Sequence, residues 1–536
     1  MNPTSSAQPK KTRRRIPISN VAVMLIVTTL AGQLLGFLRT RLINANFDNP
    51  MTPASDRAGI YFAAFNIPDF FFYTIAAGAL GVAFMPYLSD RLYKGDRRGM
   101  WELTSSIMNL LSLVMLVIGI IILIFAQPLI HLVASGLEPV QIDRAATLMR
   151  FLALNPFLFT ISGILTSAQQ TLGRFFFYAI APLFYNLSII ASIYIFKGTS
   201  LGIVGLGVGA LIGALIQLAV IAAGLINTHF HWRPKIAWRS SDFRGMLRQL
   251  PPRSLDQGMD QVQSLVETRF ASHIGNGAAS ISIYNNAYIL HTAPILLLGT
   301  AISTAAFPRL NQRLSQNRPD LFRKDFLQVL RTMIWLAMPV VIIAYFSRGY
   351  LARLIFSNNA PDIAMTFGFL TAAIFFRTVY AIISRWFYAQ KDTKTPLFVS
   401  VFTIAFNIAL TITLSRLYGV PGLAMAQSAA AAVEVLILAV IMIVRDRGLL
   451  DRVFWGGVSR IVSVTGFTVV AAFVSVSFFP LDASDRGMAI LGKLTFVSAV
   501  VIAVHMLLSW LFGLEEMRPV IERLKRWALR PVHLDY

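Results

Sequence analysis

A continuous apolar stretch near the start of the chain reads ISNVAVMLIVTTLAGQLLGFL, from Ile18 to Leu38. A helix of roughly 20 apolar residues can cross the hydrocarbon core of a bilayer. The basic residues from Lys10 to Arg15 precede it, as in a signal peptide, but the apolar stretch is too long for one and no small-residue cleavage site follows. The sequence therefore predicts a first membrane span here, with the amino terminus in the cytoplasm.

The composition of the whole chain has the same character. Of its 536 residues, 56% are hydrophobic and 13% are charged, whereas a soluble chain carries about a quarter charged residues. This composition excludes a soluble enzyme, a disordered scaffold and a coiled coil. The net charge of +22 is typical of the basic cytoplasmic loops of membrane proteins, so no nucleic-acid partner is expected. The chain has no cysteine, and no metal site is predicted.

Fourteen stretches have the length and composition of membrane spans, and they predict an all-α polytopic membrane protein with about 14 transmembrane helices. They cover residues 18–43, 59–88, 105–126, 145–170, 175–196, 201–226, 249–272, 279–307, 327–347, 363–388, 396–415, 419–444, 459–479 and 489–512.

The distribution of basic residues supports this count. With the amino terminus inside, the segments on the cytoplasmic side hold 30 of the 47 Lys and Arg residues, as the positive-inside rule requires. The seventh span, 249–272, is far more polar than the others. Without it, the basic segment from Arg309 to Lys324 would lie outside. The alternation therefore favours fourteen spans, with both termini cytoplasmic.

An internal repeat organises these spans. Ala168-Gln169 and Asn186 recur as Ala389-Gln390 and Asn407, and Pro86 recurs as Pro308 in a similar context, at nearly the same offset along the chain. The repeating unit is six spans, and an even number of spans gives both copies the same orientation in the membrane. The sequence predicts two six-helix lobes in parallel repeat, facing a central cavity, plus two C-terminal helices.

These features predict the domain boundaries. We expect a basic cytoplasmic leader at 1–17, an N-lobe of spans 1–6 at 18–232, a C-lobe of spans 7–12 at 233–444, spans 13 and 14 at 445–513, and a basic amphipathic cytoplasmic tail at 514–536.

Several motifs in order resemble those of one known family. They are Leu35-Gly36-Phe37-Leu38-Arg39 in span 1, Ala63-Ala64-Phe65-Asn66-Ile67-Pro68 in span 2, Gly173-Arg174-Phe175 before span 5, and the run Phe387-Tyr388-Ala389-Gln390-Lys391-Asp392 after span 10. From about Ile18 to Leu511 the chain resembles the MurJ (MviN) lipid II flippases of the MOP exporter superfamily.

The resemblance implies a transporter and not an enzyme. It implies a flippase that moves a polyprenyl-diphosphate-linked peptidoglycan precursor, lipid II, from the inner to the outer leaflet of the bacterial cytoplasmic membrane by alternating access. The expected partners are this precursor, membrane lipids and the cell-wall synthesis machinery. No bound cofactor is expected, and the expected energy source is a monovalent cation gradient or the membrane potential.

Two other interpretations stay open. One is a MOP-superfamily exporter of another lipid-linked glycan or of a cationic small molecule. The other is a scaffold for cell-wall assembly that does not transport. The acidic residues of the seventh span favour a cargo different from lipid II.

Five residues are candidates for substrate binding. Arg39 keeps the position of a family arginine, and Gln33 stands six residues before it where the family has another. In the seventh span Arg253, Asp260 and Glu267 recur with helical spacing and are expected on a polar face toward the cavity.

Four further residues are candidates for a structural or coupling role. Asp256 lies three residues after Arg253 and could pair with it. Arg377 in span 10 could pair with Glu434 in span 12, and a buried structural pair is the favoured interpretation. His291 in span 8 is expected to be a core histidine rather than a proton carrier.

Overall fold

A computed structural model shows the fold of the chain for residues 18–49, 51–77, 84–356, 358–482, 484–518 and 522. These residues form helices, and no strand occurs among them. The leader predicted at 1–17 and most of the tail predicted at 514–536 lie outside the described residues, as does part of the span predicted at 59–88.

The first half of the chain contains seven long or medium helices and one short one within the described residues. They are α1 (Ile18–Phe47), α2 (Ala58–Phe71), α4 (Met85–Tyr93), α5 (Arg97–Val133), α6 (Pro139–Leu152), α7 (Asn155–Thr171), α8 (Phe176–Phe196) and α9 (Gly205–Ala223). The short segments Ala54–Asp56 and Gly202–Val204 are 3₁₀ turns.

The second half repeats this order and adds two helices. They are α10 (Ser241–Ser272), α11 (Gly277–Pro294), α12 (Ala301–Ser315), α13 (Pro319–Phe346), α14 (Arg348–Ile355), α15 (Ala360–Ala389), α16 (Lys394–Tyr418), α17 (Val420–Arg445), α18 (Arg452–Phe478) and α19 (Gly487–Leu511). Glu515–Met517 is a final 3₁₀ turn.

Eleven helical stretches of the described chain are long and apolar enough to cross a membrane. The three predicted spans not among them fall on α1, α2 and α10. The count of fourteen is consistent with this result. For α10, the reason is composition, because its sequence is rich in polar residues such as Asp260, Gln263 and Glu267.

The repeat is visible in the order of the elements. Helix α1 begins the first half at Ile18, and α10 begins the second half at Ser241. Two π-helical segments are separated by the same offset, Phe72–Ala77 after α2 and Ile295–Thr300 after α11. A π-helix is rare and occurs often at functional sites. The duplicated element order therefore extends to an unusual backbone feature.

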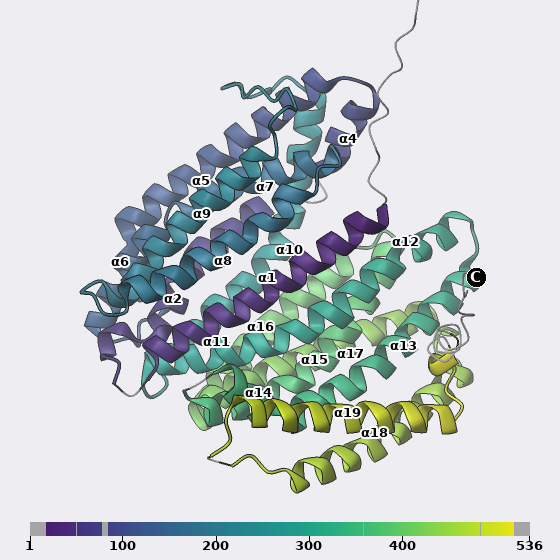
Figure 1. The fold of residues 1–536 in the computed structure, drawn as a ribbon. Helices are drawn as coiled ribbons and strands as arrows, with labels where there is room; N and C mark the ends of the chain where they lie inside the picture. The colour runs from purple at the N-terminus through teal and green to yellow at the C-terminus, as the bar shows by residue number, and fades with distance from the viewer. Residues whose placement is uncertain are drawn as a thin grey trace, which may run out of the picture.

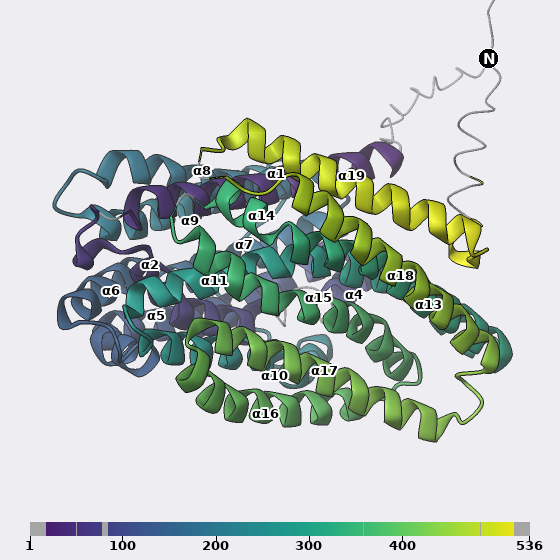
Figure 2. The same cartoon turned by 90° about the horizontal axis from the view of Figure 1, so that it is seen from below.

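The helices form two groups that meet along a central seam (Figure 1). Helices α5 to α9 pack on one another in the first group, and α13 and α15 to α17 pack in the second. Helix α1 runs between the groups, and α10 contacts α2 and α5 on one side and α16 on the other. Helices α18 and α19 lie side by side and cover α13 and α14 (Figure 2).

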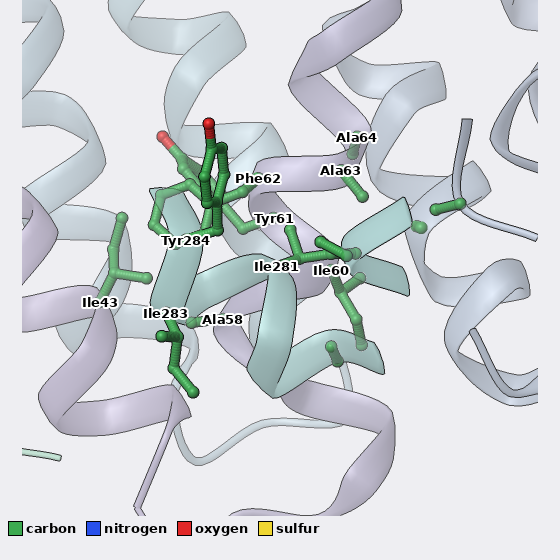
Figure 3. Close-up of a cluster of buried hydrophobic side chains, with 14 of the residues drawn as sticks. Ile43, Ala58, Ile60, Tyr61, Phe62, Ala63, Ala64, Ile281, Ile283 and Tyr284 are labelled. Atoms are coloured by element: carbon green, nitrogen blue, oxygen red, sulfur yellow. The ribbon is translucent and has the colours of Figure 1, made fainter. Parts of the chain in front are cut away.

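The seam is closed at one end by tightly packed apolar residues. Ile43 of α1, Ile60 of α2 and Ile281 of α11 belong to one buried cluster (Figure 3). Close approach of α2 and α11 depends on Gly59, because a Cβ atom there would lie 1.8 Å from the carbonyl oxygen of Ala278. Small residues allow membrane helices to approach in this way.

We expect Gly59→Ala to destabilise the protein by about 1–3 kcal/mol, since the added methyl group must push two backbones apart. Gly466→Ala is the matched control, because a Cβ at Gly466 meets nothing within 4 Å and alanine favours a helix. Thermal unfolding of the two purified variants checks this. Equal melting temperatures for both variants would contradict the packing argument.

Candidate functional site

A cavity of about 840 Å³ lies along the central seam. Its walls come from α1, α2 with the π-helical segment Phe72–Ala77, α7, α8, α9, α10, and α11 with the π-helical segment Ile295–Thr300. Helices of the first group thus form most of the wall, and α10 and α11 close it from the other side. The formally charged residues among its described lining are Arg39 and Asp69.

Arg39 reaches the cavity from α1. Its Nη1 donates a hydrogen bond to Oδ1 of Asn186 on α8, at 3.0 Å. Its Nε is buried and has no hydrogen-bond partner among the described residues. Arg39 as a residue belongs to the cavity lining, so its positive charge is what the cavity offers to an anionic ligand. Gln33, the other candidate on α1, also lines the cavity.

Asp69 lies on α2 and is the second charged group of the cavity. Its carboxylate interacts electrostatically with the Arg39 guanidinium. The two charges leave the described lining with no formal net charge. Arginine donors beyond Arg39 are absent from this described lining, so the cavity offers one cation and several neutral hydrogen-bonding groups to a ligand.

Aromatic rings make up a large part of the remaining wall. Five tyrosines line the cavity, Tyr61, Tyr73, Tyr178, Tyr185 and Tyr288. Phe159 contacts Tyr185 edge to face, with ring centroids 5.2 Å apart. Tyrosine combines an apolar ring with a hydroxyl, so this wall suits a ligand that has both apolar faces and polar groups.

Helix α10 presents two different polar faces. Gln261 and Ser264 line the cavity, and Ser264 donates a hydrogen bond to Asn66 of α2 at 3.1 Å. Glu267 instead is buried and accepts a hydrogen bond from Gln263 at 2.9 Å. The sequence predicted Glu267 on the cavity face, whereas the structure places it outside the cavity lining.

Gln263 lies on the same face of α10 as Glu267. This face is turned toward the second group of helices. Gln263 contacts Gln427 of α17, which accepts a hydrogen bond from Asn407 of α16 at 3.0 Å. Asp260 is exposed and is not part of the cavity lining. Helix α10 passes through Arg253 and Asp256, but their side chains lie outside the described residues.

Arg377 and Glu434 form the ion pair that the sequence predicted. Nη1 of Arg377 on α15 lies 3.1 Å from Oε2 of Glu434 on α17, and Ser400 donates a hydrogen bond to the other carboxylate oxygen at 2.7 Å. His291 is buried on α11 beside Tyr288, with ring centroids 5.2 Å apart. Neither the ion pair nor His291 lines the cavity.

The comparison with known sequences covers most of the chain. The profile of the family described as lipid II flippase MurJ matches residues 53–484. The chain belongs to the MurJ family.

Relatives in this family match over most of their length. Three of them carry the name "Probable lipid II flippase MurJ". The relative from Borreliella burgdorferi is 22% identical over 76% of this chain and 79% of its own length. The relatives from Rhizobium meliloti and Thermotoga maritima are 24% and 23% identical, over 89% and 92% of this chain and 91% and 97% of their own lengths.

Solved structures show the same fold. A structure of the lipid II flippase MurJ in an inward closed conformation aligns with a TM-score of 0.73 and 21% identity, over 93% of this chain and all of that one. An inward-facing MATE family multidrug transporter of the MOP superfamily aligns with a TM-score of 0.65 and 16% identity, over 80% of this chain and 98% of that one. The MurJ-family chain described here is therefore an all-helical, multi-pass membrane protein with the fold of this superfamily.

A buried polar cluster joins the two helix groups at the end of α1. We call Asn44, Asp48, Ser282 and Asn286 the Asn44 cluster. Asn286 of α11 donates to Oδ1 of Asn44 at 2.7 Å, and the Ser282 hydroxyl donates to Asp48 and lies 2.9 Å from the same Asn44 oxygen. All four side chains are buried. This cluster seals one end of the seam.

Sequence reasoning did not select Asp69, the tyrosine wall or the Asn44 cluster. A signal for Asp69 was present, because an acidic residue inside a span is costly and usually functional. The tyrosines had no such signal, since aromatic residues in a span are ordinarily packing residues. The Asn44 cluster joins residues that lie far apart in the sequence, on α1 and α11, so it becomes visible only in the folded chain.

Asp48 lies one residue beyond the end of α1, and its carboxyl makes the stability of the protein depend on pH. Burial raises the pKa of this carboxyl from its ordinary 3.8 to about 6, although the hydrogen bonds from Ser282 and the Ala58 amide and the charge of Arg57 oppose the rise. The folded protein thus keeps the proton to a higher pH than the unfolded chain does. The stabilisation is complete below about pH 4 and is lost as the pH rises through about 6.

We therefore expect the melting temperature of the protein to fall between pH 5 and pH 7 by more than that of Asp48→Asn. The asparagine keeps the hydrogen-bonding capacity of the site but cannot ionise. The whole shift corresponds to about 3 kcal/mol, of which about 1.3 kcal/mol falls between pH 5 and pH 7. Parallel melting curves of the two proteins across this pH range would show that Asp48 does not titrate as argued.

Proposed function

We propose that this protein moves lipid II, a polyprenyl-diphosphate-linked peptidoglycan precursor, from the inner to the outer leaflet of the bacterial cytoplasmic membrane. The guanidinium of Arg39, the one cationic group in the described lining of the central cavity, is the observation that carries the proposal. A diphosphate group is rich in acceptor oxygens, and guanidinium donors match them in geometry. Membership in the family and the names of its relatives support the same cargo.

The rest of the cavity suits the rest of such a head group. The sugars and charges of the precursor cannot cross hydrocarbon unaided, because each unsatisfied polar group costs several kcal/mol there. Asn66, Ser264 and Gln261 offer neutral hydrogen-bonding groups, and the tyrosine rings offer faces for sugar rings to pack on. The polyprenyl tail would remain in the lipid.

The arrangement of the helices supports alternating access. The Asn44 cluster seals the seam at the end of α1, which the positive-inside rule puts on the outer face of the membrane. This orientation leaves both termini cytoplasmic. Helix α10 bonds with α2 through Ser264 and with α17 through Gln263. Any motion between the two groups of helices must therefore exchange contacts of α10.

We infer that a monovalent cation or proton gradient drives the cycle through Glu267. A buried carboxylate in a membrane is expensive unless a cation or a proton compensates it. Its polar neighbours Gln263 and Tyr284 are neutral, while Arg377 is engaged by Glu434. Arrival of a cation at Glu267 would change the contacts that hold α10 against the second group of helices.

Complementation tests the cargo. Expressed in a bacterium depleted of its own lipid II flippase, the chain should restore growth, and Arg39→Ala should lose at least tenfold in plating efficiency, because a hydrogen bond to a charged group contributes about 1.5–3 kcal/mol. Arg41→Ala is the matched control, since Arg41 is exposed on the same helix and does not line the cavity. Absence of rescue by the protein in the membrane would point to another cargo or to a scaffold.

Asp69→Asn distinguishes an anionic cargo from a cationic one. The change gives the described cavity lining a net charge of +1, so an anionic head group should bind several-fold more tightly and a cationic molecule more weakly. Binding of lipid II and of a lipophilic cation to the purified variant checks this. Tighter binding of the cation would favour the exporter alternative.

The dependence of transport on an imposed ion gradient tests whether Glu267 couples transport to that gradient. In proteoliposomes, Glu267→Gln should keep lipid II binding but make transport insensitive to imposed proton and sodium gradients, because glutamine retains the shape of the residue without its charge. Asp362→Asn serves as the comparison, since Asp362 is an exposed carboxylate near the start of α15 and does not line the cavity. A Glu267→Gln protein that still responds to a gradient like the wild type would refute the role of Glu267.

A further inference from the structure

A second cavity, of about 400 Å³, lies where the beginning of α5 meets the segment between α9 and α10. It shares no lining residue with the central cavity, and it lies on the side of the membrane that the basic residues predict to be cytoplasmic. Its described lining residues are Arg97, Arg98, Trp101, Glu102, Thr228, His229, His231 and Arg233.

Positive charge is in excess in this cavity. Glu102 is the one acidic residue of its described lining, and it pairs with both Arg98, at 3.4 Å, and Arg233. Arg97 is exposed, and its side chain has no hydrogen bond or ion pair within the part of the chain that the structure describes. Three guanidinium groups against one carboxylate leave two positive charges before the two histidines are counted.

The wall of the cavity is fixed by hydrogen bonds to α5. Asn109 accepts a hydrogen bond from Nε1 of Trp232 at 2.8 Å and donates one to the carbonyl oxygen of Arg233 at 2.6 Å. The Ala237 amide donates to Oγ of Ser106 at 3.2 Å. The segment that carries Arg233 is therefore held in place before any ligand arrives, which lowers the cost of binding.

The backbone of this segment has an uncommon conformation. Asn227 and His229 adopt left-handed φ angles of 63° and 58°, a conformation that is rare in residues other than glycine. The neighbouring Phe230 packs on Trp101, with ring centroids 4.9 Å apart. His229 belongs to the cavity lining in this conformation.

Nearby aromatic residues place the cavity at the level of lipid head groups. Trp232 and Trp238 are 57% and 55% exposed, and tryptophan concentrates at the interface between membrane and water. Further along α5, Leu113 and Val117 are exposed apolar residues that suit contact with acyl chains. A ligand in the cavity would thus have hydrocarbon on one side and water on the other.

We propose that this cavity binds the phosphate group of an anionic phospholipid, with Arg97 and Arg233 as the principal contacts. Guanidinium groups form strong, paired hydrogen bonds with phosphate oxygens, and basic pockets at the cytoplasmic ends of membrane helices bind lipid head groups. A soluble phosphate ester has the same chemistry but no acyl chains to lie along α5. The site is separate from the central cavity, so the proposal does not rest on the proposed cargo.

Native mass spectrometry of the purified full-length protein tests the site. The protein is titrated with phosphatidylglycerol and, separately, with phosphatidylcholine, and glycerol 3-phosphate is added as the soluble competitor. Arg97→Gln is compared with Arg452→Gln, which removes the same charge from an exposed position on the same predicted side, outside this cavity. Thermal unfolding establishes that both variants are folded.

We expect the wild type and Arg452→Gln to retain phosphatidylglycerol in preference to phosphatidylcholine. Arg97→Gln should need about tenfold more phosphatidylglycerol for the same occupancy, the effect of losing one charged hydrogen bond. Equal weakening in both variants, or no preference for the anionic lipid, would overturn the proposal. Displacement of the lipid by an equal concentration of glycerol 3-phosphate would assign the cavity to soluble phosphate esters and overturn the lipid assignment.

Discussion

A bilayer supplies no hydrogen-bond partners to the polar groups inside it, and this constraint shapes the whole protein. Many serine and threonine hydroxyls bond to a backbone carbonyl one turn back on their own helix, as Thr160 does, and larger polar side chains bond between helices. Arg39 bonds with Asn186, Arg377 with Glu434, and Asn407 with Gln427. Each bond joins two different helices, so the polar groups fix which helices are neighbours.

The same constraint separates structural polar groups from functional ones. Where the partners are complete, as for Arg377 with Glu434, the group belongs to the framework. Arg39 instead bonds to a neutral partner, Asn186, and belongs to the lining of the cavity, so its charge is available to a ligand. The distinction rests on bonding, because arginines in both roles look alike in sequence.

Much of the fold was predictable from sequence for this reason. The apolar stretches, the basic loops and the duplicated motifs all reflect the solvent in which each segment lies, and they indicated the helical class and the repeat. The pairing of Arg377 with Glu434 was predictable because an unpaired charged side chain inside a membrane has a high free-energy cost. The sequence did not predict which face of α10 is turned toward the cavity. Helical spacing groups Asp260, Gln263 and Glu267, but only packing decides that Gln263 and Glu267 turn away from the cavity that Gln261 lines.

The π-helical segment Ile295–Thr300 sets the direction of the side chains of α12, which follows it directly. A π turn holds about one residue more than an α turn, so the residues after it are rotated by roughly 100° relative to an uninterrupted helix. A helical wheel drawn through Ile295–Thr300 therefore assigns the side chains of α12 to the wrong face. Loss of a single residue from this segment would act as a twist of α12 relative to α11.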